Sequence, residues 1–345
     1  MGRKPLPLLC GFLMLALFGC DRGQDKLPGI LLITLDTVRA DHLGCYGYEA
    51  IETPNLDRLA AEGVLFEQAQ SPVPVTLPAH SSMFTGQYPA VHGVRYNGMF
   101  KLGEGSITVA ERLADAGWAT VGMPAAYPLI TGTGIGQGFQ VYRDLFEEVP
   151  EEEIGKDGER NAGEITDQAI EWLGNRQEDQ PFFMWLHYWD AHFPYKPPFP
   201  FSSTYRDRPY DGEIAYLDQE FGRLMAYLEE TGLDEDILIL VAGDHGEGLH
   251  DHGEKMHANL VYQSTMQVPL IARAPGCKKG FRVLESVSLV DVGPTILDYA
   301  GLAPGPQVQG ISLRQALNGE EPAPRSIYFE ALSGSLSFGW SPLEG

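Results

Sequence analysis

Continuous apolar runs constrain the fold more than any other feature of this sequence. Five of them, rich in aliphatic, β-branched and aromatic side chains, lie at residues 29–35, 119–122, 181–187, 237–242 and 268–273. Runs without alternation are typical of strands buried on both faces. Helical patterns separate them, at residues 54–62, 107–116, 162–173, 211–231 and 290–300. This order predicts an α/β fold, a three-layer sandwich with a mostly parallel central sheet and helices on both faces.

Ionisable side chains follow three of these runs closely. Asp36 comes after the first run, Asp190 and His192 after the run at 181–187, and Asp244 and His245 after the run at 237–242. Ligands of open α/β sheets bind beyond the carboxyl ends of the strands. We therefore expect these side chains to converge at one edge of the sheet.

The segment Gly-Asp-His-Gly-Glu at 243–247 predicts a metal site. Asp244 and His245, joined by Asp36, offer the oxygen and nitrogen ligands that transition metals accept. The alternative is that Asp244 caps a following helix and His245 is an ordinary turn residue, which leaves Asp36 unexplained. Four of the nine histidines fall within thirteen positions here: His245, His250, His252 and His257. We expect His250 to take no part in the site.

Thr76 precedes a Leu-Pro step and a helical pattern over residues 78–84. Near a helix N-terminus, the helix dipole and free N–H groups favour a bound oxyanion and an ionised hydroxyl. The alternative is that Thr76 is the N-cap of that helix. A metal ion held by Asp36, Asp244 and His245 would favour a nucleophilic role, because it lowers the pKa of a hydroxyl.

The N-terminal residues 1–19 have the composition of a signal peptide. Arg3 and Lys4 precede an apolar run at 8–18, shorter than the roughly 20 residues of a membrane-spanning helix. The run ends in Leu-Phe-Gly-Cys, which resembles a bacterial lipobox, so we expect lipidation of Cys20; simple cleavage is the alternative. Both predict export to the bacterial cell envelope or periplasm. Lipidation would attach the protein to the membrane, with residues 20–28 as a linker.

Net charge limits the partners. With 24 Lys and Arg against 47 Asp and Glu, the chain carries a charge of −23, which repels phosphate backbones, so no nucleic-acid partner is expected. A local cation would have to attract an anionic substrate. Beyond Cys10 and Cys20, only Cys45 and Cys277 remain, without metal-type spacing. The acidic stretch 147–157 predicts a solvated loop.

Seven motifs together resemble the sulfatase family of the alkaline phosphatase superfamily. They lie at residues 31–47, 53–60, 85–95, 190–195, 243–253, 262–271 and 291–298. The resemblance implies an alkaline-phosphatase-like catalytic domain over 29–318. Family members usually continue into a C-terminal subdomain, so residues 319–345 are expected to begin a truncated C-terminal region.

Four positions depart from the usual sulfatase pattern. Sulfatases carry Cys or Ser in C-x-P-x-R, which is converted to formylglycine, whereas this chain has Thr76 and, in the Arg position, His80. Threonine carries a β-methyl group and cannot become an aldehyde, so no formylglycine is expected. Thr37 replaces the usual second Asp, and Asp244-His245 replaces the Asp-Asn of calcium-binding sulfatases. These changes favour one Mn²⁺ or Zn²⁺ over Ca²⁺ or Mg²⁺.

The departures look like threonine-nucleophile members such as lipoteichoic acid synthases and related phosphoglycerol transferases. That resemblance implies four metal ligands: Asp36, Thr76, Asp244 and His245. Asn97 falls at the position from which phosphonate monoester hydrolases contact the anion. The family resemblance implies further substrate contacts from His80, Arg95, His192 and His257. Arg95 has the alternative of pairing with a nearby acid. A less favoured interpretation lets Asp190 join His192 and His257 around a second metal ion.

We therefore expect an exported, metal-dependent hydrolase or transferase that cleaves phosphoric or sulfuric esters, with Thr76 as nucleophile and His192 or His257 as general acid. A threonine sulfate would be harder to resolve by attack at sulfur, so the anionic substrate is expected to be a phosphate ester first. Two alternatives stay open at this point: a genuine sulfuric ester hydrolase, and a non-catalytic envelope binding protein that kept the fold.

Overall fold

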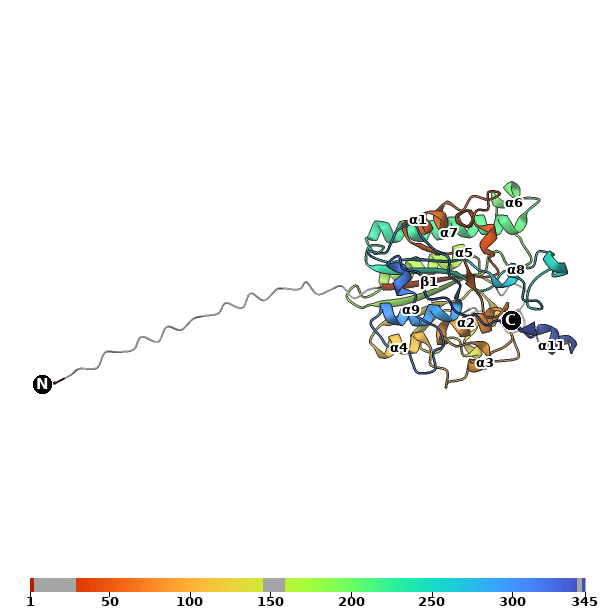
Figure 1. The fold of residues 1–345 in the computed structure, drawn as a ribbon. Coiled ribbons are helices and arrows are strands. Elements are labelled where there is room, and N and C mark those ends of the chain that lie inside the picture. The colour runs from red at the N-terminus through yellow and green to blue at the C-terminus, as the bar shows by residue number, and fades with distance from the viewer. Residues whose placement is uncertain (3–28, 145–158, 340–342, 345) are drawn as a thin grey trace.

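The computed structural model describes residues 1–2, 29–144, 159–339 and 343–344 (Figure 1). The body of the predicted signal peptide, Cys20, the linker and the acidic stretch 147–157 lie outside these ranges. Among the described residues, no helix combines the length and the hydropathy needed to cross a membrane.

Strand β1 (Gly29–Leu35) forms the centre of an eight-stranded sheet, between β6 (Phe182–Tyr188) and β7 (Ile237–Gly243), and runs parallel to both. The strand order is β5-β4-β6-β1-β7-β8-β2-β9. The outer strands are β5 (Val141–Tyr142), β4 (Ala119–Met123), β8 (Leu270–Arg273), β2 (Val64–Phe66) and β9 (Phe281–Val283). The mostly parallel sheet is thus confirmed, and β8 alone runs antiparallel to its neighbours in it.

Helices cover both faces of the sheet (Figure 1). One layer contains α1 (Pro54–Glu62), α5 (Ala162–Asn175) and α7 (Pro209–Thr231). The other contains α2 (Thr76–Thr85), α4 (Val109–Asp115) and α9 (Val292–Tyr299). The three-layer prediction is therefore confirmed. The helix predicted over 290–300 begins instead as a 3₁₀ turn, η6 (Leu289–Asp291), before α9.

Short elements complete the described chain. The strands are β3 (Ala69–Gln70), β10 (Val287–Ser288), β11 (Glu330–Ala331) and β12 (Leu343–Glu344). The helices are α3 (Pro89–His92), α6 (Phe201–Thr204), α8 (Gln263–Met266), α10 (Arg314–Leu317) and α11 (Ser333–Phe338). The 3₁₀ turns are η1 (Ala40–His42), η2 (Gly44–Tyr46), η3 (Tyr127–Leu129), η4 (Thr131–Thr133) and η5 (Asp251–Gly253).

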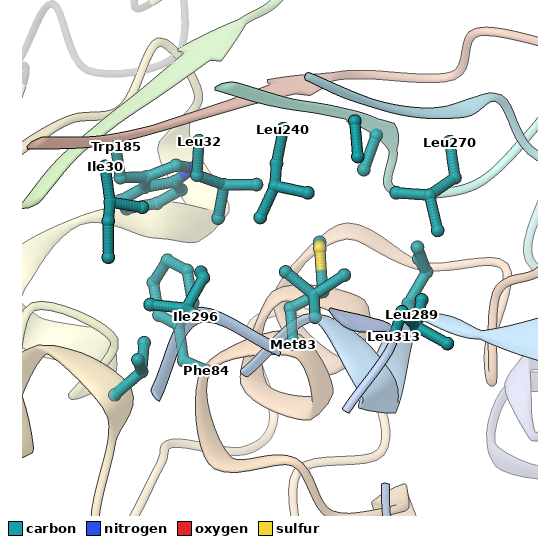
Figure 2. Close-up of a cluster of buried hydrophobic side chains, with 14 of the residues drawn as sticks. Ile30, Leu32, Met83, Phe84, Trp185, Leu240, Leu270, Leu289, Ile296 and Leu313 are labelled. Atoms are coloured by element: carbon teal, nitrogen blue, oxygen red, sulfur yellow. The ribbon is translucent and has the colours of Figure 1, made fainter. Parts of the chain in front are cut away.

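Alternate residues of β1 build two separate cores. Ile30 and Leu32 pack with Phe84 of α2 and Ile296 of α9 (Figure 2), whereas Leu31 and its alternate neighbours join the cluster under α1, α5 and α7. Because successive side chains of a strand point to opposite faces, an unbroken apolar run is what a doubly covered strand requires. The two cores fix the central strands, and therefore the positions of the residues that follow them.

Buried His92 provides a test of stability. Its Nδ1 accepts from Val94 N (3.1 Å), so Nε2–H donates to Ser82 Oγ (2.9 Å) and joins α3 to α2. Burial lowers the pKa of His92 to about 3. The unfolded chain binds this proton near pH 6.5 and the folded chain only near pH 3, so falling pH favours unfolding.

We expect His92→Asn, which keeps an acceptor for Val94 N–H, to weaken this pH dependence. Between pH 7 and pH 5, the wild type should lose about 2 kcal/mol more of its unfolding free energy than the variant. Urea denaturation at both pH values measures the difference. Equal losses in the two proteins would contradict the neutral, buried state of His92.

Candidate active site

The predicted convergence of side chains after the strands is confirmed for Asp36, Asp244 and His245, whereas Asp190 lies with other partners. Asp36 follows β1, and Asp244 and His245 follow β7, which is paired directly with β1. The side chains of all three residues are fully buried. One carboxylate oxygen of each aspartate and one ring nitrogen of the histidine lie within 4.8 Å of one another.

The hydroxyl of Thr76 completes this group. Thr76 Oγ1 lies 3.3 Å from His245 Nε2. The same nitrogen is 3.5 Å from Asp244 Oδ2 and 3.8 Å from Asp36 Oδ1. The four residues that the family resemblance implies as metal ligands therefore gather around one point.

The donor atoms fit a divalent cation. Both carboxylate oxygens of Asp36, and Oδ2 of Asp244, are buried without a hydrogen-bond partner in the described part of the chain. Burying such acceptors uncompensated is costly, and a cation between them would offset that cost. The Nδ1–H of His245 donates to Gly246 O (3.0 Å), which leaves the Nε2 lone pair for a metal.

Charge coupling agrees with this geometry. Burial raises the pKa values of both Asp36 and Asp244. Repulsion from the Asp36 carboxylate raises the pKa of Asp244 further. Burial alone would lower the pKa of His245, but the adjacent Asp244 and Asp36 outweigh it and raise that pKa. Two close carboxyl groups with three oxygens free of hydrogen-bond donors favour a bound cation.

Thr76 is not the N-cap of α2, so that alternative is wrong. It is the first helical residue, Val75 occupies the N-cap position, and Val75 provides no side-chain cap. Asn97 takes over this task, because its Oδ1 accepts from Leu77 N (2.9 Å). That bond fixes the half-buried amide of Asn97 beside Thr76, where the resemblance implies a contact with the substrate anion.

His80 lies behind the site, one helical turn after Thr76. Its Nδ1–H donates to Thr76 O (2.8 Å), and its Nε2 accepts from the hydroxyl of Thr34 (2.9 Å). The side chain is fully buried, and burial lowers its pKa to about 3. Both ring nitrogens of His80 are therefore already hydrogen-bonded to the protein, which leaves none for the predicted contact with the substrate. The placement instead fits a role in holding the first turn of α2.

Two further histidines lie next to the metal group. The ring centroid of His257 is 4.4 Å from that of His245 and 5.3 Å from that of His192. His192 donates from Nδ1 to Phe193 O (2.7 Å), and His257 donates from Nδ1 to Glu247 Oε1 (3.2 Å). Burial lowers both pKa values, that of His192 to about 4. Each neutral ring therefore presents an Nε2 lone pair.

Arg95 pairs with a nearby acid, as the alternative interpretation predicted. Its Nε donates to Glu330 Oε1 (2.7 Å) and its Nη2 donates to Glu330 Oε2, a two-point ion pair with a fully buried carboxylate. The hydroxyl of Tyr328 also donates to Glu330 (2.7 Å), and Glu330 N donates to Pro72 O (3.0 Å). The arginine that was a candidate substrate contact thus anchors β11 beside the loop that leads into α2.

Asp190 and Thr37 point to other partners. Asp190 Oδ2 accepts from Ala162 N at the start of α5, and burial together with Glu213 raises its pKa well above its usual value. No group of possible metal-ligating side chains in the described residues includes Asp190, which weighs against the two-metal interpretation. The hydroxyl of Thr37 donates to Ala191 O (2.7 Å).

The sequence analysis missed two residues of the site. His187, in β6, has its Nε2 3.3 Å from Asp36 Oδ2. Glu247 is fully buried and accepts from His257, Gly248 N and the hydroxyl of Tyr195. A histidine inside an otherwise apolar run and a glutamate inside the 243–247 motif were the available signals. The prediction relied on the residues that directly follow the strands, and therefore named neither residue.

Comparisons with known proteins identify similar chains. The family model described as Sulfatase matches residues 28–302. An arylsulfatase of Clostridium perfringens is 26% identical over 400 residues, covering 90% of this chain and 82% of the relative. N-acetylgalactosamine-6-sulfatase of Canis lupus familiaris is 27% identical over 363 residues, covering 89% and 69%.

Solved structures share the fold. A phosphonate monoester hydrolase of Silicibacter pomeroyi superimposes with a TM-score of 0.75 at 23% identity, covering 91% of this chain and 83% of that one. A protein solved in complex with its substrate D-glucosamine-2-N,6-O-disulfate gives a TM-score of 0.76 at 22% identity, covering 89% and 84%.

Metal binding at this group is testable by stability. We expect Mn²⁺ or Zn²⁺ to raise the melting temperature of chelator-treated protein. At an ion concentration of a hundred times Kd, the free energy of unfolding should increase by about 2.7 kcal/mol. Asp244→Asn should abolish the rise, because it removes a charged ligand while its amide oxygen can still accept from Thr37 N and His245 N. Differential scanning calorimetry measures the shift.

Asp251→Asn is the matched control, since Asp251 is a half-exposed carboxylate outside the metal group. Its protein should respond to the ions as the wild type does. An unchanged metal response of Asp244→Asn would exclude Asp244 as a ligand.

Proposed function

The chain belongs to the sulfatase family and is a hydrolase of sulfate or phosphate esters, and we propose that it attacks phosphoric esters with Thr76 as its nucleophile. One observation carries the proposal. The Thr76 hydroxyl lies 3.3 Å from His245 Nε2, within the group of buried, unpaired carboxylates. An ordinary structural threonine would not need such a position.

The side chain of Thr76 favours phosphorus over sulfur as the centre attacked. Its β-methyl group excludes conversion to an aldehyde, and with it the hydrate by which formylglycine enzymes expel sulfate. A threonine ester must instead be released by attack at the central atom, which proceeds more readily for phosphate than for sulfate. This is why phosphate esters come first in the proposal.

Metal dependence is a property of the family, and the residues that would hold the ion here are Asp36, Thr76, Asp244 and His245. Such an ion supplies Lewis acidity and lowers the pKa of an oxygen ligand. With two carboxylates, one hydroxyl and one imidazole nitrogen as ligands, we propose Mn²⁺ or Zn²⁺ as the ion. Asn97, oriented by its bond to Leu77 N, is proposed to donate from its amide to the substrate anion.

The reaction balances in two halves. First, Thr76 Oγ1 forms a bond to phosphorus and the ester oxygen leaves; the threonine loses its proton and the leaving oxygen gains one. Then water attacks phosphorus, inorganic phosphate departs, and a proton returns to Thr76. Positioning and charge stabilisation provide most of what such transfers require.

His192 and His257 are proposed to carry the protons. Because both rings are neutral with an Nε2 lone pair, each must first accept a proton before it can act as the acid expected from the sequence. Glu247 supports this cycle at His257, since a carboxylate on Nδ1–H stabilises a ring that becomes protonated at Nε2.

Sulfuric ester hydrolysis is the second candidate, favoured by the names of the relatives, an arylsulfatase among them. The non-catalytic alternative is not retained, because the family match and the intact site both support an enzyme. The organic part of the substrate stays undefined in both candidates.

Thr76→Val and Thr76→Ser test the nucleophile. Valine preserves shape and removes the hydroxyl, so kcat should fall on the order of 10⁴-fold or more, whereas serine should keep measurable turnover. The substrates are 4-nitrophenyl phosphate, its diester, a phosphonate ester and 4-nitrophenyl sulfate, each with Mn²⁺, Zn²⁺, Ca²⁺ or chelator. Intact mass after acid quench should reveal a phosphorylated wild type.

Full activity of Thr76→Val would overturn the nucleophile. Turnover of the sulfate with all phosphate and phosphonate esters untouched would overturn the substrate preference and establish the second candidate. Thr85→Val, at the other end of α2, controls for loss of a buried helical hydroxyl; its Oγ1 donates to Ser81 O (2.7 Å).

Export and lipid attachment at Cys20 form a separate proposal, supported by the charged and apolar segments at 3–18 and the lipobox-like ending. In a bacterial host, radiolabelled palmitate should enter the wild type, and Cys20→Ala should abolish labelling and release the protein from membranes. Absent labelling together with an unchanged distribution of Cys20→Ala would overturn lipidation.

A further inference from the structure

His187 lies next to Asp36, on the side of that carboxylate away from His245. It is fully buried in β6, the strand paired with β1 on the side opposite β7. Its Nε2 lies 3.3 Å from Asp36 Oδ2, whereas Asp36 Oδ1 faces His245. Within the described residues, His187 Nε2 and Asp36 Oδ2 are both buried and neither forms a hydrogen bond. At 3.3 Å they are close enough for a small rotation of either side chain to join them.

The backbone fixes which nitrogen of His187 carries the proton. Ala125 N–H donates to Nδ1 (3.3 Å), so Nδ1 must present its lone pair. A neutral imidazole then carries its proton on Nε2, the atom that faces Asp36. A ring protonated on both nitrogens would set an N–H against the Ala125 N–H, so this contact requires the neutral form.

This tautomer excludes His187 as a metal ligand. His80, His187 and Asp244 do form a second group of possible ligands with atoms within 4.8 Å of one another. However, His187 Nε2 carries a proton, and His80 Nδ1 gives its own proton to Thr76 O. A nitrogen that carries a proton has no lone pair for a cation.

We propose that His187 is a positioning residue: its Nε2–H donates to Asp36 Oδ2 and thereby reserves Oδ1 for the metal ion. The inference rests on the metal site of the proposed function. Partners of this kind beneath a ligating carboxylate fix its orientation and are typically worth 10–100-fold in metal affinity.

His80 lies beside His187 and has the opposite tautomer, with its proton on Nδ1. Trp185 Nε1–H donates to Thr34 Oγ1 (2.9 Å), the Thr34 hydroxyl donates to His80 Nε2 (2.9 Å), and His80 Nδ1–H donates to the backbone of Thr76. The His80 and His187 rings lie 5.1 Å apart, both neutral.

Two amide variants separate the two hydrogen bonds of His187. His187→Asn can accept from Ala125 N–H but removes the donor toward Asp36. His187→Gln places an amide N–H near the former Nε2 and loses the bond to Ala125. Isothermal titration calorimetry with Mn²⁺ and with Zn²⁺ alone gives affinity and stoichiometry, and melting curves in chelator show that each variant is folded.

We expect His187→Asn to bind either ion 10–100-fold more weakly than the wild type with unchanged stoichiometry, and His187→Gln to stay within about threefold. Wild-type affinity in His187→Asn would overturn the positioning role, and so would loss of a bound ion from the stoichiometry. A wild type that binds neither ion would overturn the metal site of the proposed function, and this role with it.

Long-range ¹H–¹⁵N spectra of protein labelled on histidine provide a second readout that does not depend on metal. The His187 resonances, identified by their loss in His187→Gln, should show the Nε2–H tautomer, and those of His80 the Nδ1–H tautomer. An Nδ1–H or doubly protonated His187 at neutral pH would overturn the inference.

Discussion

Two buried carboxyl groups, with only one of their four oxygens hydrogen-bonded, dominate the energetics of this site. Asp36 and Asp244 lie at the ends of neighbouring central strands, where both helical layers exclude water. Interiors tolerate such a concentration of negative charge only when something positive compensates it. The surrounding side chains fit that requirement, since His245 turns a lone pair toward the acids, and His187 and His80 stay neutral beneath them.

Much of the fold follows from the sequence because its signals are local. Residues 29–35 have no alternation since both faces of β1 are covered, and α1 occupies the predicted range 54–62. The convergence of Asp36, Asp244 and His245 also follows, because parallel strands place their carboxyl ends at one edge. The reversal of β8 does not follow, since periodicity carries no information on strand direction.

Side-chain partners were harder to predict than positions. Arg95 and His80 stand where family resemblance implies substrate contacts, yet one pairs with Glu330 and the other with Thr76 O and Thr34. Each of these partners except Thr76 is distant in sequence, so no local pattern reveals it. His187 was missed for the same reason, because its role depends on the tautomer that Ala125 imposes.

The distance along the chain between the two acids has a consequence for biogenesis. Asp36 and Asp244 belong to segments 208 positions apart that meet only when β7 has docked on β1. A nascent or partly folded polypeptide can offer a cation only the adjacent Asp244-His245 pair, which is too few ligands for tight capture. Binding of an ion at the proposed site therefore follows closure of the central sheet.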